Sequence, residues 1–175
     1  MKDSKIIDMD NMLDAKEKRY YKIKDLTEKF GLPVLSFMLN IPGEDKNFKD
    51  AVNFHKDYIK EIKKTFDDNE IKIIYEEYHN LNTGMEYLAV FNGNGKFVKE
   101  KMIDLEEKDL GGRLLDIDIY DSDFSQISRS VLNLPERRCI LCTGIARTCI
   151  KEERHSLNDL KEKVRRILKN YKMEN

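Results

Sequence analysis

The pattern of apolar and polar positions predicts two long helices in the first part of the chain. Apolar residues recur at helical spacing over residues 9–30 and again over residues 52–66. Gly31 and Pro33 form a stop signal after the first segment, and the polar residues at 67–69 end the second. Each predicted helix therefore has one apolar face to pack against a core.

Segments dense in apolar and β-branched residues predict buried strands at 34–41, 71–78 and 85–91. Residues 102–106 alternate weakly and predict a further strand, whereas the region from Cys139 onward has helical spacing. A last helix is predicted to begin at Ser156, because Asp159 three residues later forms a partial capping box.

Elements in this order predict an α+β fold with a mixed, largely antiparallel sheet covered by helices. We expect one domain over residues 1–175, with a helical C-terminal part from about residue 139.

Composition narrows the classes of function. The 175 residues are 40% hydrophobic and 37% charged, with a net charge of −1, so nothing predicts a nucleic-acid partner. No apolar run approaches the ~20 residues of a membrane span, so no membrane partner is expected either. The first eight residues lack the apolar segment of a signal peptide, and three cysteines suit free thiols. We therefore expect a cytoplasmic protein.

The most informative segment is Gly-Arg-Leu-Leu-Asp-Ile-Asp-Ile at residues 112–119. It alternates apolar and acidic residues, so a strand here places Asp116 and Asp118 on one face and the isoleucines on the other. Two carboxylates on one face repel each other, and Mg²⁺ relieves that repulsion while binding substrate phosphates. The alternative is an ordinary exposed edge strand, since such acidic pairs are common.

Several cations could bind phosphate. Gly43 and Lys46 follow the first predicted strand and precede a helix, where free backbone N–H groups favour anions. Arg113, Arg129 and Arg137 surround the acidic strand in sequence, and arginine forks match phosphate oxygens. The alternatives are an ordinary strand-to-helix turn and solvated loop charges.

The cysteines allow two interpretations. Cys139, Cys142, Cys149 and His155 have the ligand types of a Cys₃His zinc site. The three cysteines also share one face of a helix, and free cysteine is often buried in a core. The second interpretation is favoured here, and it predicts reduced cysteines packed along a helix, without a disulfide.

The chain resembles the CitX family over roughly residues 10–170. The family signature Gly-Arg-Leu-x-Asp-Ile-Asp-Val is similar to residues 112–119. Further similar segments are Asn40 to Gly43 with Lys46, Ser128-Arg129, Leu134-Pro135-x-Arg137-x-Cys139-x-Leu141-Cys142, and Ala146, Cys149 and His155. This combination is far more specific than any one motif.

The resemblance implies an apo-citrate lyase phosphoribosyl-dephospho-CoA transferase, also called holo-citrate lyase synthase. Such an enzyme transfers the prosthetic group from 2′-(5″-triphosphoribosyl)-3′-dephospho-CoA to a serine of the citrate lyase acyl carrier (γ) subunit, and diphosphate leaves. A related malonate decarboxylase holo-protein synthase is described as nucleotidyltransferase-like, so that fold is implied too.

Under this resemblance, the predicted site residues take specific roles. Asp116 and Asp118 would bind Mg²⁺, with Glu106 as a third carboxylate on a neighbouring strand. Arg113, Arg129, Arg137, Lys46 and Gly43 would bind the phosphates of the donor. Two alternatives stay open: the same transfer onto another carrier, such as that of malonate decarboxylase, and a non-catalytic assembly factor that only binds the carrier.

Overall fold

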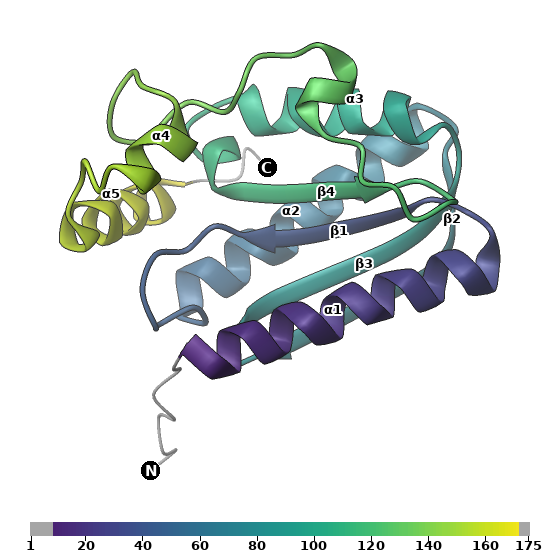
Figure 1. Ribbon diagram of the computed structural model, residues 1–175, viewed down its shortest axis with the longest axis horizontal. Coiled ribbons are helices and arrows are strands. Elements are labelled where there is room, and N and C mark those ends of the chain that lie inside the picture. The colour runs from purple at the N-terminus through teal and green to yellow at the C-terminus, as the bar shows by residue number, and fades with distance from the viewer. Residues whose placement is uncertain (1–8, 172–175) are drawn as a thin grey trace.

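The computed structural model describes residues 9–171 and is built on one four-stranded antiparallel sheet (Figure 1). The strands are β1 (Val34–Leu39), β2 (Lys72–Leu81), β3 (Gly84–Asn92) and β4 (Leu115–Tyr120), in the order β2-β3-β1-β4. The helices are α1 (Met9–Phe30), α2 (Lys49–Asp68), α3 (Gly95–Glu107), α4 (Ala146–Lys151) and α5 (Leu157–Asn170). The predicted α+β class is confirmed. Residues 1–8 and 172–175 lie outside the described residues, so the expected lack of a signal peptide in the first eight residues and the predicted domain ends fall outside them.

The sheet has two different faces. One face packs against α2 and forms the larger core, in which Phe37 of β1 and Ile117 of β4 are in register and buried. On the other face, Ile23 and Leu26 of α1 pack against Val34 and its neighbours. Because α1 lies over β1 and β3, the start of β4 stays exposed on this second face (Figure 1).

The strand predicted at 102–106 is wrong, since these residues belong to α3. The side chain of Asn94 caps this helix by accepting a hydrogen bond from the Phe97 amide at 3.0 Å. The buried positions Val98, Met102 and Ile103 have helical spacing. The five-residue window was too short to separate this spacing from strand alternation.

The helical C-terminal part begins later than predicted. Residues 139–145 form a loop, and the first helix after it is α4, which begins at Ala146. The predicted start of the last helix is confirmed, because the Ser156 side chain accepts a hydrogen bond from the Asp159 amide at 3.1 Å. No helix in residues 9–171 has the length and apolar character needed to cross a membrane.

Candidate functional site

The acidic strand forms as predicted. Along β4, Leu115, Ile117 and Ile119 are buried, while Asp116 is exposed and Asp118 is partly exposed. The two carboxylates lie on the face that α1 shares, where Asp116 is opposite Met38 and Asp118 is opposite Ser36. The alternation of strand side chains therefore places both carboxylates on one face.

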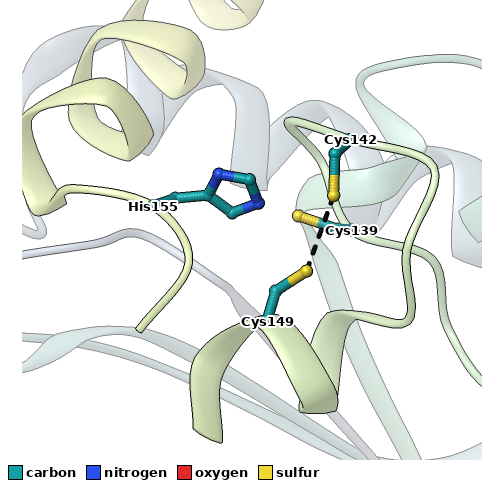
Figure 2. A group of neighbouring side chains, drawn as sticks. All are labelled: Cys139, Cys142, Cys149 and His155. Carbon is teal, nitrogen blue, oxygen red and sulfur yellow. Dashed lines mark hydrogen bonds between the residues drawn. The ribbon is translucent and has the colours of Figure 1, made fainter. Parts of the chain in front are cut away.

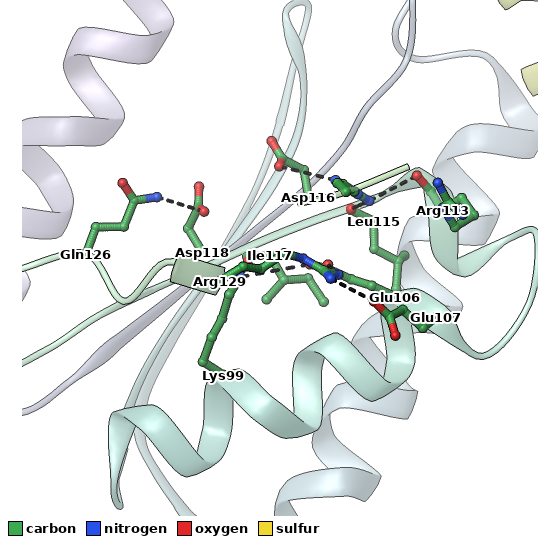
Figure 3. Close-up of polar contacts among 11 residues, drawn as sticks. Lys99, Glu106, Glu107, Arg113, Leu115, Asp116, Ile117, Asp118, Gln126 and Arg129 are labelled. Atoms are coloured by element: carbon green, nitrogen blue, oxygen red, sulfur yellow. Dashed lines mark hydrogen bonds and ion pairs between the residues drawn. The ribbon is translucent and has the colours of Figure 1, made fainter. Parts of the chain in front are cut away.

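Both carboxylates line a cleft of about 440 Å³ beside β4 (Figure 3). The strand provides the floor, α3 provides one wall, and the chain after β4 provides the other. The lining residues from these walls are Lys99, Glu106, Gln126, Ser128, Arg129, Ser130, Glu136, Arg137 and Arg147. Asp116 and Asp118 thus lie in a concave site rather than on a flat exposed edge.

The outer edge of β4 is covered by donors from the cleft walls. Arg137 donates to the carbonyl of Leu115, and the buried Lys99 ammonium donates to that of Ile117. The next carbonyl along this edge, that of Ile119, accepts from the Ile127 amide at 2.8 Å. These bonds satisfy an otherwise unpaired strand edge and fix two cationic side chains beside the carboxylates.

The charges around Asp116 and Asp118 are not balanced. Asp118 accepts a hydrogen bond from Gln126 at 2.8 Å, and an Asp116 oxygen lies 3.9 Å from an Arg137 nitrogen. The pKa of Asp116 is raised, first by the loss of surrounding water in the cleft and then by the charge of Asp118. A cation that joins the two carboxylates would remove this repulsion.

Glu106 and Arg129 form a buried ion pair in the wall of the cleft. The Arg129 guanidinium donates to Glu106 and to Glu107, both at 2.7 Å, and its side chain is only 15% exposed. Glu106 also lies 4.0 Å from the Lys99 ammonium. Its predicted position on a neighbouring strand is wrong, because Glu106 lies in α3, and its carboxylate is already shared between two cations.

Three of the predicted phosphate-binding residues do not line the cleft. Arg113 points toward the loop after β4, where it donates to the carbonyl oxygens of Arg138 and Cys139. Gly43 and Lys46 lie in the loop between β1 and α2, and the Lys46 ammonium donates to the Ile41 carbonyl.

Backbone conformation and packing explain why residue 43 is a glycine. Its φ is +83°, and a Cβ atom there would lie 2.1 Å from Cε of Lys161 in α5. The glycine therefore permits a positive φ and leaves room for the end of the Lys161 side chain.

Arg147 is a cleft residue that the sequence analysis missed. It lies in the first turn of α4 and is exposed. It forms no ion pair or hydrogen bond with the residues that the structure describes, unlike Arg129 and Arg137. Only its place after the cysteine loop could have indicated it, since nothing local marks it as a ligand-binding residue.

The cysteines are free, but they are not aligned along a helix as predicted. Cys139 and Cys142 lie in the loop before α4, Cys149 lies in α4, and His155 lies just before α5. Cys139 and Cys149 are buried, whereas Cys142 is exposed. The helical prediction is wrong because spacings of three and ten residues suit a folded loop equally well.

Comparison with known proteins identifies the family of this chain. The family model for CitX, described as apo-citrate lyase phosphoribosyl-dephospho-CoA transferase, matches residues 7–171. The chain belongs to the CitX family.

Relatives of this CitX-family chain agree with the assignment. It is 28% identical over 166 residues to a Vibrio cholerae protein named as a probable apo-citrate lyase phosphoribosyl-dephospho-CoA transferase, covering 94% of the chain and 93% of the relative. A Streptococcus pyogenes protein of the same name is 30% identical, with 94% and 87% covered. The chain is also 35% identical to the protein CitXG of Leuconostoc mesenteroides, which matches 91% of the chain. The chain spans only 34%, about a third, of that longer protein.

Proposed function

We propose that this chain transfers the prosthetic group of 2′-(5″-triphosphoribosyl)-3′-dephospho-CoA to a serine of the citrate lyase acyl carrier (γ) subunit. The transfer forms a phosphodiester with the serine oxygen and breaks a phosphoanhydride, so that diphosphate leaves. Membership of the CitX family supports the type of transfer. The cleft supports the chemistry, since it combines two carboxylates with several cations.

The residues of the cleft fit a divalent cation. Asp116 is exposed and shares its face of β4 with Asp118, and the pKa of Asp116 is raised, first by the loss of surrounding water and then by the charge of Asp118. Two carboxylates that leave room for water and phosphate oxygens are the donor set that Mg²⁺ prefers. A bound Mg²⁺ would neutralise charge that develops on the phosphate oxygens. Glu106 is not needed as a third ligand in this proposal.

Each of the three arginines of the cleft has a different role in binding the donor phosphates. Arg147 is exposed in the cleft and has no ion-pair or hydrogen-bond partner among residues 9–171, so it is the cation most available to the donor phosphates. Arg129 is fixed by Glu106 and Glu107, and its position is therefore set before the substrate binds. Arg137 is held by the backbone of β4 and contributes positive charge next to Asp116.

The observation that carries the proposal is the shared cleft of Asp116, Asp118 and the three arginines. The test is the intact mass of the purified apo-carrier after incubation with the enzyme, the donor and Mg²⁺. We expect the carrier mass to rise by that of the prosthetic group, with one diphosphate released per carrier.

Two comparisons separate the alternatives. An assembly factor would bind the carrier without a mass change or diphosphate release. Exchanging the citrate lyase carrier for the malonate decarboxylase carrier should abolish the transfer. Equal rates on both carriers would contradict the proposed acceptor.

A further inference from the structure

A compact group of side chains that can bind a metal ion lies outside the cleft. One ligand atom from each of Cys139, Cys142, Cys149 and His155 lies within 4.8 Å of the other three. The ring of His155 faces the three sulfurs, which come from the loop and from α4 (Figure 2). We propose that these four residues bind a structural Zn²⁺ ion.

The sulfur geometry suits a tetrahedral ion. The sulfurs of Cys142 and Cys149 are 3.5 Å apart. Zinc–sulfur bonds of about 2.3 Å in tetrahedral array place two sulfurs about 3.8 Å apart. A disulfide would require about 2.05 Å and would leave the third cysteine and the histidine without a role.

The loop between Cys139 and Gly144 is folded around its sulfurs. The Cys139 amide donates to the Gly144 carbonyl at 2.7 Å, which closes the turn. The Leu141 amide donates to the Cys139 sulfur and the Gly144 amide to the Cys142 sulfur, both at 3.4 Å. Backbone donors of this kind orient the ligands of metal sites and balance their negative charge. Packing of neutral thiols in a core does not require such donors.

His155 gives an independent indication. Its Nε2 atom is buried and has no hydrogen-bond partner among the described residues. Burying a polar nitrogen without a partner is unfavourable, and a ligand bound to this atom would remove that cost. Figure 2 shows the ring pointing toward the sulfurs, where a metal ion would satisfy Nε2.

The ligand set selects zinc and a structural role. Three thiolates and one imidazole fill all four positions of a tetrahedral ion, and no position remains for water or substrate. The site ties together the loop at 139–145, α4 and the turn before α5. Arg137 precedes Cys139 by two residues, and Arg147 lies between Cys142 and Cys149 in sequence, so a zinc ion would fix the backbone that carries these two cations of the cleft.

The first test is the metal content of the full chain, purified without a histidine tag under reducing conditions and washed with a weak chelator. We expect about one zinc per chain in the unchanged protein. Replacement of the zinc by Co²⁺ should give intense visible absorption of a tetrahedral ion together with thiolate charge-transfer bands. A folded protein with almost no zinc, or a Cys142–Cys149 disulfide in its intact mass, would overturn the proposal.

Variants identify the ligands. Cys142→Ser should lose most of the zinc, and His155→Gln should weaken zinc binding about tenfold or more in competition with a chromophoric chelator. The matched control is His79→Gln, which changes an exposed histidine of β2 and should keep full zinc content. Zinc content that is unchanged in both ligand variants would refute the site. If the variants do not fold, the stoichiometry and the cobalt spectrum of the unchanged protein decide.

Discussion

The cleft that contains Asp116 and Asp118 is open to solvent, whereas the ligand atoms of the cysteine cluster face one another. In the cleft, Asp116 keeps 55% of its side chain exposed, and Arg147 has no ion-pair or hydrogen-bond partner in the part of the chain that the structure describes. In the cluster, the four ligand atoms already face one another, and two of the cysteines are buried. Open oxygen ligands suit an exchangeable cation that arrives with substrate, whereas a closed set of sulfur ligands suits a permanent ion.

The two regions are nevertheless joined by a short stretch of backbone. Arg137 donates to the carbonyl of Leu115 in β4, and Arg113 donates to the carbonyls of Arg138 and Cys139. The cluster can therefore hold one wall of the cleft without taking part in the reaction. Loss of the cluster should act mainly on stability, and loss of the carboxylates should act mainly on turnover.

The largest expected effect is on turnover in the cleft. Asp118→Asn removes a charged ligand from the proposed Mg²⁺ site, and we expect turnover to fall about 1,000-fold, since such losses cost several kcal/mol of transition-state stabilisation. The rate of carrier modification at saturating Mg²⁺ measures this effect. Asp104→Asn, at an exposed position of α3, is the matched control and should keep normal activity. Near-normal turnover of Asp118→Asn would exclude this carboxylate as a metal ligand.

Removing zinc should affect stability more than chemistry. A zinc-selective chelator should lower the midpoint of thermal unfolding by about 10 °C, because the ion binds only the folded chain. Removing Mg²⁺ should instead stop turnover reversibly and lower that midpoint by only about 1–3 °C. Calorimetry with each ion removed in turn checks the contrast. An unfolding midpoint that depends on Mg²⁺ but not on zinc would reverse our assignment of the two sites.

The unpaired arginine should matter for donor binding. Arg147→Gln removes the free cation of the cleft, so we expect the KM for the donor to rise about tenfold with a smaller change in kcat. Steady-state kinetics with varied donor measures it. The control is Arg166→Gln, which changes an exposed arginine of α5 paired with Glu162. Equal kinetics of the two variants would show that Arg147 does not bind the donor.

Arg129→Lys tests geometry rather than charge. Lysine keeps the positive charge but loses the fork that bridges Glu106 and Glu107, so we expect activity to fall by about threefold to tenfold. The unfolding midpoint should change little. Full activity of the lysine variant would indicate that charge alone is needed at this position.

The smallest expected effect is a gain in stability. The raised pKa of Asp116 means that its ionised form is unfavourable in the folded chain, so the fold loses stability as the pH rises from the ordinary aspartate pKa of 3.8 to the raised pKa. Without Mg²⁺, Asp116→Asn should therefore raise the unfolding midpoint at neutral pH by about 1–3 °C. This gain should vanish below the ordinary aspartate pKa of 3.8. A lower midpoint for the variant at neutral pH would contradict an unfavourable ionised form of Asp116 in the cleft.

Local sequence patterns were sufficient to predict the two faces of β4 and the start of α5, because each depends on residues only a few positions apart. Strict alternation over residues 115–120 determined which side of β4 carries Asp116 and Asp118, because successive strand side chains point to opposite faces. The start of α5 at the Ser156 cap was likewise readable, since the cap bonds an amide only three residues away.

Only the tertiary structure decided which distant residues meet. Arg113 and Arg137 have the same chemistry, and Arg113 is much nearer to the acidic pair in sequence, yet Arg137 lines the cleft and Arg113 holds the cysteine loop. Glu106 became a partner of Arg129 through the packing of α3 against β4.

The cysteine cluster also separates what the sequence predicts from what the tertiary structure decides. The sequence determined the ligand types and their spacing. It did not determine whether Cys139 and Cys142 belong to a helix or to a loop, because both arrangements bring residues three apart close together. In the structure these residues form a loop in which backbone amides donate to sulfur, and His155 approaches the sulfurs from the turn before α5. The amide-to-sulfur contacts span only two residues, whereas the meeting of Cys142 with Cys149 and His155 depends on how the loop, α4 and the turn before α5 pack together.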